Sequence, residues 1–250
     1  MKPTGSPPDA SVSDPSPALL WGRAVRTRLA GPAVAVAMAA SIAAGAGGCA
    51  SSSQPAVQLT EQWPAAAGDY REVSQKWTRR AREHSGPDPS QGRITDQTLA
   101  LIATFKSPEW RAAYVKFRAA QYRLPPSEVA AMTEREKADA AKTYEVELLV
   151  ATYDRRLNEL QRGRRSVWRI ALVDSAGAEI VASEIQRDRR PRSEIIADFP
   201  QLGDFHQAYV ARFPHTVDLL RPDAGKFSLK MTSSQVGVEL VWAGPGAGQR

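Results

Sequence analysis

Cysteine is almost missing from this chain of 250 residues, because Cys49 is the only one. A single cysteine excludes a disulfide within the chain, a cysteine-rich zinc site and a CxxC redox pair. Charge of one sign is also lacking, since 33 Lys and Arg stand against 27 Asp and Glu, for a net charge of +6. Dedicated nucleic-acid-binding domains carry a more concentrated basic surface. We therefore expect no nucleic-acid partner.

The short motifs of several large enzyme classes are absent as well. The chain has no GxSxG nucleophile elbow, no HExxH zinc helix, no Walker A loop and no EF-hand loop. Glycines alternate at Gly244, Gly246 and Gly248, but no helix follows that could present backbone amides to a phosphate. The sequence thus predicts no cofactor and favours a protein that is not an enzyme.

One long run without charge is present, from Leu29 to Ala44. Arg23, Arg26 and Arg28 precede it, and small residues follow it. A basic start, a short apolar segment and small residues at the end are typical of a secretory signal peptide. We predict one over residues 1–48. The alternative is a retained membrane anchor, because the stretch from Leu29 to Cys49 spans 21 residues and a membrane span needs about 20, although the stretch is rich in Ala and Gly.

Cys49 directly follows Ala46, Gly47 and Gly48. This arrangement resembles the lipobox of bacterial lipoproteins, with Ala46 in the place where the usual pattern has Leu. The resemblance implies that Cys49 is the lipidation site, that it becomes the first residue after cleavage, and that a lipid holds the protein at the membrane. No Asp follows Cys49, so the inner-membrane retention signal of enteric lipoproteins is absent. We expect an outer-membrane anchor with the domain facing the periplasm.

Residues 1–22 are rich in Pro, Ser, Gly and Asp, which predicts disorder. The alternative is that translation begins later, at Leu20 or Val25. Removing residues 1–48 takes away four basic and two acidic side chains and lowers the net charge to +4. The rest of the chain is predicted as a lipidated cysteine with a flexible tether (49–68), one globular domain (69–243) and a disordered tail (244–250).

Within the domain, apolar periodicity predicts a helix over 69–84 and a helical part over 107–142, the latter introduced by Ser107 and Pro108. Residues 144–151 are predicted as a strand, with a helix as the alternative. Alternating apolar residues predict the other strands near 97–105, 168–173, 180–185, 209–213, 227–231 and 238–242. The fold class expected is all-β or α+β: a β-sandwich of about six to seven strands, with an inserted helical hairpin and an N-terminal helix.

A second resemblance covers roughly the last hundred residues. The pattern Trp-Arg-x-x-Leu-x-Asp-x-x-Gly from Trp168 to Gly177, with a closing strand Val-Glu-Leu-Val-Trp, is similar to uncharacterised lipoproteins of the bacterial envelope. It implies an envelope protein, and it brings no activity and no functional residues with it.

Residues able to do acid–base or metal chemistry are few and scattered. His84, His206 and His215 show no ligand spacing to one another, so no metal site is predicted. Glu145 and Glu147 share one face of a predicted strand, where paired carboxyls can do acid–base work if their pKa values differ. We interpret them instead as the solvated face of that strand. The alternative function is a periplasmic hydrolase built from Asp204, His206 and Glu147.

Arginine clusters are the remaining feature: Arg79, Arg80 and Arg82; Arg162, Arg164 and Arg165; and Arg187, Arg189, Arg190 and Arg192. Such clusters can hold a domain against an anionic lipid surface, or they can simply solvate the fold beside nearby acids. The sequence therefore favours a lipid-anchored, non-catalytic binding or structural module whose partner is an envelope protein or an anionic lipid surface. A further alternative is an assembly factor that grips a partner through a sheet edge.

Overall fold

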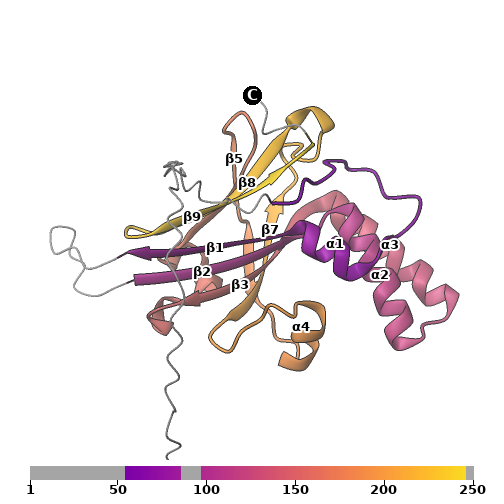
Figure 1. The fold of residues 1–250 in the computed structure, drawn as a ribbon, viewed down its shortest axis with the longest axis horizontal. Helices are drawn as coiled ribbons and strands as arrows, with labels where there is room; N and C mark the ends of the chain where they lie inside the picture. The colour runs from indigo at the N-terminus through magenta and orange to yellow at the C-terminus, as the bar shows by residue number, and fades with distance from the viewer. Residues whose placement is uncertain (1–53, 86–96, 246–250) are drawn as a thin grey trace, which may run out of the picture. The chain divides into compact units, whose positions relative to one another are not determined.

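The computed structural model describes residues 54–85 and 97–245 (Figure 1). The predictions for the signal peptide, for the start of translation, for lipidation of Cys49 and for residues 246–250 lie outside these ranges. Among the described residues, no helix is long and apolar enough to cross a membrane.

Two antiparallel sheets form the body of the domain. The five-stranded sheet has the order β1 (Thr78–Ser85), β2 (Gln97–Phe105), β3 (Thr143–Thr152), β7 (Gln207–Pro214) and β6 (Glu184–Arg187). The four-stranded sheet has the order β5 (Glu179–Val181), β4 (Arg169–Val173), β8 (Lys226–Thr232) and β9 (Gly237–Ala243). The predicted α+β, β-sandwich-like fold class is confirmed. The predicted strand number was too low, because the described residues form nine.

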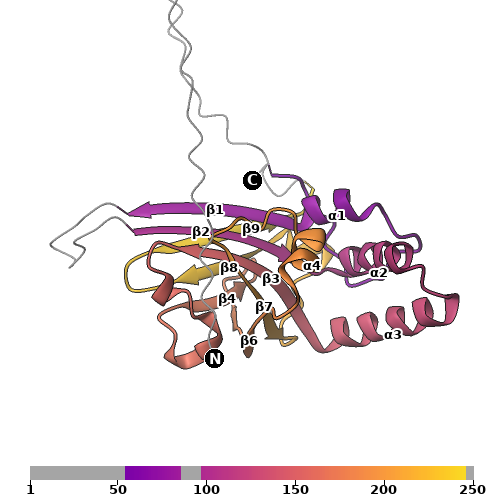
Figure 2. The ribbon, with the colours of Figure 1, turned by 90° about the horizontal axis from the view of Figure 1, so that it is seen from below.

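Helices α1 (Tyr70–Trp77), α2 (Pro108–Tyr122) and α3 (Pro126–Lys142) gather beyond one end of the sheets (Figures 1 and 2). The predicted N-terminal helix and helical hairpin are confirmed. Ser107 begins α2 as expected, because its hydroxyl accepts a hydrogen bond from the backbone N–H of Trp110 at 3.1 Å. No local pattern predicted α4 (Arg192–Asp198) or the short 3₁₀ helices η2 (Arg155–Leu157), η3 (Leu160–Arg165) and η4 (Pro222–Ala224).

The first helix is shorter than predicted, since α1 ends at Trp77 and the following residues form β1. Tyr70, Val73 and Trp77 complete the buried stripe of the helix. Beyond them Arg79 is buried, and its guanidinium donates to the carbonyl oxygens of Val241 at 2.7 Å, Lys76 at 2.8 Å and Pro55 at 2.8 Å. A buried arginine satisfied by backbone groups from three segments favours the extended form that pairs with β2.

Large aromatic side chains fill the space between the sheets. The rings of Phe227 and Trp242 stack with centroids 5.2 Å apart, and Phe105 lies 4.8 Å from Phe227. The indole N–H of Trp242 donates to the carbonyl oxygen of Trp77 at 2.9 Å, which joins β9 to the start of β1. Buried aromatic residues contribute the largest apolar areas to a core. This core connects both sheets with α1.

The predicted strand over 180–185 divides between the two sheets. β5 pairs with β4, and the backbone N–H of Ala182 still donates to Ile170 at 3.1 Å. The next residue, Ser183, donates to the carbonyl oxygen of Arg212 at 2.9 Å, and β6 pairs with β7. β4 and β5 form an antiparallel hairpin, but one continuous strand over 180–185 was wrong, because the chain crosses from one sheet to the other after three residues of pairing.

The flexible tether predicted over 49–68 is wrong for its described part. Val57 and Leu59 are buried in the core, and the backbone N–H of Val57 donates to the carbonyl oxygen of Ala243 at 2.9 Å. At the other terminus, the N–H of Gly244 donates to Gly225 at 2.7 Å, so the predicted tail begins too early. The domain therefore includes the described parts of both flanking segments, because each contacts apolar or backbone groups of β9 and its neighbours.

Candidate functional site

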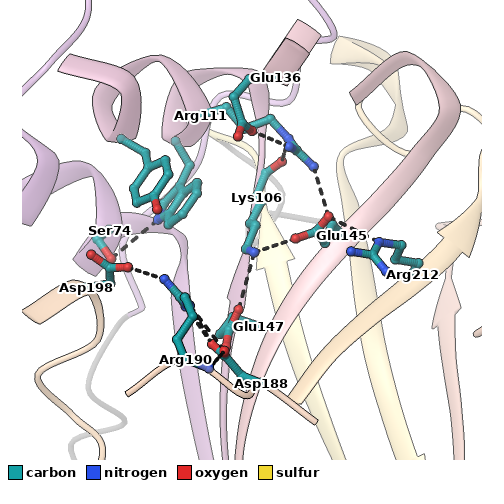
Figure 3. Close-up of polar contacts among 12 residues, drawn as sticks. Ser74, Lys106, Arg111, Glu136, Glu145, Glu147, Asp188, Arg190, Asp198 and Arg212 are labelled. Atoms are coloured by element: carbon teal, nitrogen blue, oxygen red, sulfur yellow. Dashed lines mark hydrogen bonds and ion pairs between the residues drawn. The ribbon is translucent and has the colours of Figure 1, made fainter. Parts of the chain in front are cut away.

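A cluster of buried and half-buried charges lies on the face of β3 that points away from the aromatic core (Figure 3). Side chains alternate along a strand, so Tyr144, Val146 and Leu148 enter the core while Glu145 and Glu147 point to the opposite side. We call this group the charge cluster. Its members are Lys106, Arg111, Glu136, Glu145, Glu147, Asp188, Arg190, Asp198 and Arg212.

Glu145 lies among three cations. Lys106 Nζ donates to one carboxylate oxygen, and Arg111 and Arg212 lie 3.7 and 3.6 Å from the other. Burial opposes ionisation of Glu145, but the three cations outweigh it and lower its pKa to about 2. Glu145 is therefore a charged carboxylate at every physiological pH.

Glu147 is two residues further along and behaves in the opposite way. Its side chain is 0% exposed, its nearest cation is Lys106 Nζ at 3.3 Å, and neither carboxylate oxygen has a hydrogen-bond partner within the described structure. Burial raises its pKa to about 7, which Lys106 only partly offsets and the nearby Asp188 reinforces. Two carboxyls on one strand face thus differ widely in their affinity for protons.

Arg190 connects this strand to α4. Its guanidinium donates to Asp198 at 2.5 Å and to Asp188 at 2.6 Å. Asp198 is buried, and its backbone carbonyl accepts a hydrogen bond from the hydroxyl of Tyr70 at 2.9 Å. Although burial opposes a charge on Arg190, the hydrogen bonds that it donates to Asp188 raise its pKa above the usual range. Arg190 is therefore a permanent cation between two acids.

Arg111 links α2 to α3 in a similar way. It donates to Glu136 at 2.5 Å and to the carbonyl oxygen of Lys106 at 3.1 Å. Pairs of this kind fix the relative positions of the helices and the sheet, because an arginine fork accepts few alternative geometries. The charge cluster thus joins β3, α2, α3, β7 and the segment that leads into α4.

A cavity of about 300 Å³ opens onto the charge cluster, and its walls include Lys106, Trp110, Glu145, Arg190 and Arg212. Glu147 is not among its lining residues. A general acid or base must come within hydrogen-bond distance of the reacting group. Glu147 has the pKa best suited to acid–base catalysis near neutral pH, but a molecule in this cavity would not touch its carboxyl group.

The structure also corrects two sequence expectations. Glu145 and Glu147 do not form a solvated strand face, because the cations described above and Asp188 pack over them. The residues of the alternative hydrolase lie in different environments: the Asp204 side chain is 97% exposed and pairs with Arg192 at 3.6 Å, whereas Glu147 is fully buried. His206 accepts a hydrogen bond from the N–H of Gly203 at 3.2 Å. The three do not form one accessible site.

The arginine clusters divide in the same manner between interior and surface. Arg79 is buried and Arg190 belongs to the charge cluster, whereas Arg80, Arg82, Arg164 and Arg165 are exposed. Arg162 pairs with Glu159 at 2.9 Å. The first and third runs are therefore not single surfaces, because Arg79 and Arg190 are withdrawn from solvent while arginines next to them in the sequence are exposed.

An apolar surface cavity of about 260 Å³ lies where β3 ends, beside the turn between β8 and β9. Tyr153 and Val167 at this cavity are 66% and 48% exposed. The indole N–H of Trp168 donates to the carbonyl oxygen of Leu157 at 2.7 Å, which holds the wall in place. We call this the Tyr153 cavity; its other lining residues are Thr152, Asp154, Ser233, Ser234, Gln235 and Val236.

Two histidines remain to be placed. His84 lies on β1 and is exposed, and His215 follows β7 with its Nε2 at 3.5 Å from Glu61 Oε1.

Comparison of the chain with protein-family models, with curated proteins and with solved structures finds no match.

Proposed function

We propose that this chain is a lipid-anchored protein of the bacterial envelope, held at the membrane through Cys49, and that its domain is a non-catalytic binding module. The observation that carries the binding role is the Tyr153 cavity, where an aromatic and a β-branched side chain are exposed beside an apolar hollow. Exposed apolar groups gathered around a concave surface are typical of interaction sites.

The size and composition of the Tyr153 cavity favour a protein partner. At about 260 Å³ it is smaller than most pockets for cofactors, which run from ~300 to ~1,000 Å³. Phe205 is a further exposed aromatic ring, and its centroid lies 5.6 Å from the guanidinium of Arg155, which follows Asp154 of the cavity wall in the chain. A partner that inserts one apolar side chain and contacts these aromatic rings would fit this surface.

Site-specific crosslinking in intact cells tests the binding role. A photoreactive phenylalanine analogue replaces Tyr153, and the matched control carries it at Tyr122, which is 52% exposed on α2. We expect one discrete adduct at position 153 that is absent at position 122 and is lost when Val167→Glu is added. Equal adducts at both positions, or none at position 153, would contradict the proposal.

The anchor is tested separately by Cys49→Ala. We expect this variant to lose palmitate labelling and to move from the membrane pellet to the soluble fraction, because the thiol is the proposed attachment point. If Cys49→Ala still pellets with membranes, the lipid anchor is wrong, while the crosslinking result remains valid by itself.

A second candidate is a hydrolase that uses the charge cluster, and the opposite pKa shifts of Glu145 and Glu147 favour it. It requires a movement of Lys106 or Arg190 that opens a path to Glu147. Assays with p-nitrophenyl esters, phosphates and glycosides distinguish the two candidates. Turnover that is lost in Glu147→Gln would replace the binding module with a hydrolase; no turnover above that of heat-denatured protein agrees with the binding module.

A further inference from the structure

Glu61, His215 and Asp218 bring one imidazole and two carboxylates together. Their ligand atoms all lie within 4.8 Å of one another. Glu61 belongs to the coil segment that precedes α1, whereas His215 and Asp218 belong to the loop that follows β7. The group therefore exists only in the folded domain, and it lies apart from both the charge cluster and the Tyr153 cavity.

Glu61 and His215 have a separation close to that of two zinc ligands. His215 Nε2 and Glu61 Oε1 are 3.5 Å apart, which is longer than the usual 2.7–3.2 Å of a hydrogen bond to nitrogen. Tetrahedral zinc with bonds of about 2.0–2.1 Å places neighbouring ligands roughly 3.3 Å apart. A mixed set of imidazole and carboxylate ligands is also the set that Zn²⁺ accepts.

A buried tyrosine orients both of these ligands. The hydroxyl of Tyr144 lies 2.9 Å from Glu61 Oε1 and accepts a hydrogen bond from the N–H of Leu219 at 3.1 Å. The ring of the same tyrosine packs against the imidazole of His215, with centroids 4.3 Å apart. Outer groups of this kind set the direction of metal ligands in proteins.

A separate observation comes from the space in front of the ligands. Glu61 and His215 both line a cavity of about 300 Å³, whose other walls are Trp63, Pro108, Lys137, Ala140 and Ala141. Lys137 is the cation of this cavity; it pairs with Glu134 at 2.9 Å, and its ammonium lies 5.6 Å from the centroid of Trp63. Glu61 and His215 lie in the wall of this open surface cavity, so an ion held by them would lie beside it, next to a positive charge that favours an anion there.

We propose that Glu61, His215 and Asp218 form a Zn²⁺ site with three protein ligands and one open position that faces this cavity. Three protein ligands and an exchangeable fourth are the arrangement of zinc sites that bind a small molecule or water, in contrast to closed structural sites. Bound zinc would also fasten the coil segment before α1 to the end of β7. This site is independent of the lipid anchor and of the Tyr153 cavity.

Calorimetric titration of the full-length chain with ZnCl₂ tests the site, with protein purified in detergent and stripped of metal by EDTA. We expect about one zinc per chain and a rise in melting temperature with zinc, because a ligand that binds only the folded state stabilises it. Cobalt(II) provides a second readout, since tetrahedral cobalt gives visible absorption bands. An absence of stoichiometric zinc binding would overturn the site.

Variants show whether the bound zinc is at these residues. His215→Ala and Asp218→Asn should each weaken binding at least ~10-fold, and Tyr144→Phe should weaken it by about 10-fold through lost orientation. The matched control is His206→Ala, which removes a half-buried histidine from a different loop and should leave zinc affinity unchanged. Equal losses in His206→Ala and His215→Ala would place the ion elsewhere. Melting temperatures without zinc show that each variant is folded.

Discussion

The two faces of β3 are stabilised in different ways, one by apolar packing and the other by paired charges. On one face, Tyr144, Val146 and Leu148 pack into the aromatic core between the sheets, where apolar contact area provides most of the stabilisation. On the other face, Glu145 and Glu147 meet Lys106, Arg111 and Arg212 under the helical end of the domain. The same strand thus shows how apolar packing and paired charge fix neighbouring elements.

The difference concerns specificity more than strength. Apolar side chains tolerate small shifts, because their contacts have no preferred direction. Buried charges tolerate few shifts, because a lost partner leaves an ion without solvent or counter-charge. We infer that the aromatic core supplies most of the free energy of unfolding, and that the charge cluster determines where α2, α3 and α4 lie on the sheet.

The largest effect should follow from damage to the apolar face. Trp242→Ala removes a fully buried ring that stacks on Phe227 and bonds to the backbone of Trp77. We expect the free energy of unfolding to fall by about 3–5 kcal/mol, measured by chemical denaturation. Ile196→Ala, at an exposed position of α4, is the control and should change it by less than about 0.5 kcal/mol. Similar losses in both variants would contradict the dominance of the core.

The next effect concerns the charged face. Arg190→Ala leaves the buried carboxylates of Asp188 and Asp198 without their principal cation. Removing one partner of a buried pair costs about 3 kcal/mol or more. We expect a fall of about 3 kcal/mol in the free energy of unfolding at pH 7, together with faster amide hydrogen exchange in α4 than in β8. Uniform exchange in both elements would show that the cluster does not position α4.

A smaller effect, with the opposite sign, is expected at Glu147. Its pKa of about 7 in the folded state lies above the ordinary value of 4.5, so the stability it contributes is complete below pH 4.5 and is lost as the pH rises to 7. Glu147→Gln should remove this loss and be about 1–3 kcal/mol more stable than the parent at pH 8.

Denaturation curves at pH 4.5 and pH 8 check this prediction. The two proteins should agree at pH 4.5, where the carboxyl of the parent is protonated when folded. Below pH 4.5 both should lose stability in parallel, because Glu145, with a folded-state pKa of about 2, takes up a proton more readily in the unfolded chain than in the folded one. If Glu147→Gln is instead less stable than the parent at pH 8, Lys106 requires the carboxylates of both Glu145 and Glu147 as counter-charges.

The smallest effect is expected at the margin of the helical end. Lys76 pairs with Glu109 at 2.9 Å, but both side chains are about 30% exposed. Exposed pairs contribute about 0–1 kcal/mol. Lys76→Ala should therefore lower the free energy of unfolding by less than about 1 kcal/mol at low salt and by less in 0.5 M NaCl. A loss as large as that of Arg190→Ala would remove the distinction between buried and surface pairs.

Local patterns predicted much of the fold. Alternation identified β3, β4, β8 and β9, and Ser107 with Pro108 marked the start of α2, because these signals depend only on nearby residues. The helical stripe that ends at Trp77 was extended too far, since the pairing of β1 with β2 and the carbonyl groups around Arg79 come from distant segments. Sheet crossing after Ala182 is likewise decided by partners that are remote in sequence.

The candidate sites were much less predictable. Glu145 and Glu147 were identified as a pair, but their burial depends on residues more than 35 positions away, such as Lys106 and Arg190. Tyr153 and Val167 carry no motif, because exposure is a property of the folded surface. Glu61 and His215 were invisible as partners, since they are separated by almost the whole domain and only the fold brings them to 3.5 Å.

The packing of the segment before α1 has a mechanical consequence. With a lipid on Cys49, a pull between membrane and domain would reach, among the contacts of the described residues, first the bond from Arg79 to Pro55 and then the bond from Val57 to Ala243. Load would therefore pass into β1 and β9, which the aromatic core holds together. Attached in this way, the domain would resist extraction by force at its most strongly packed point.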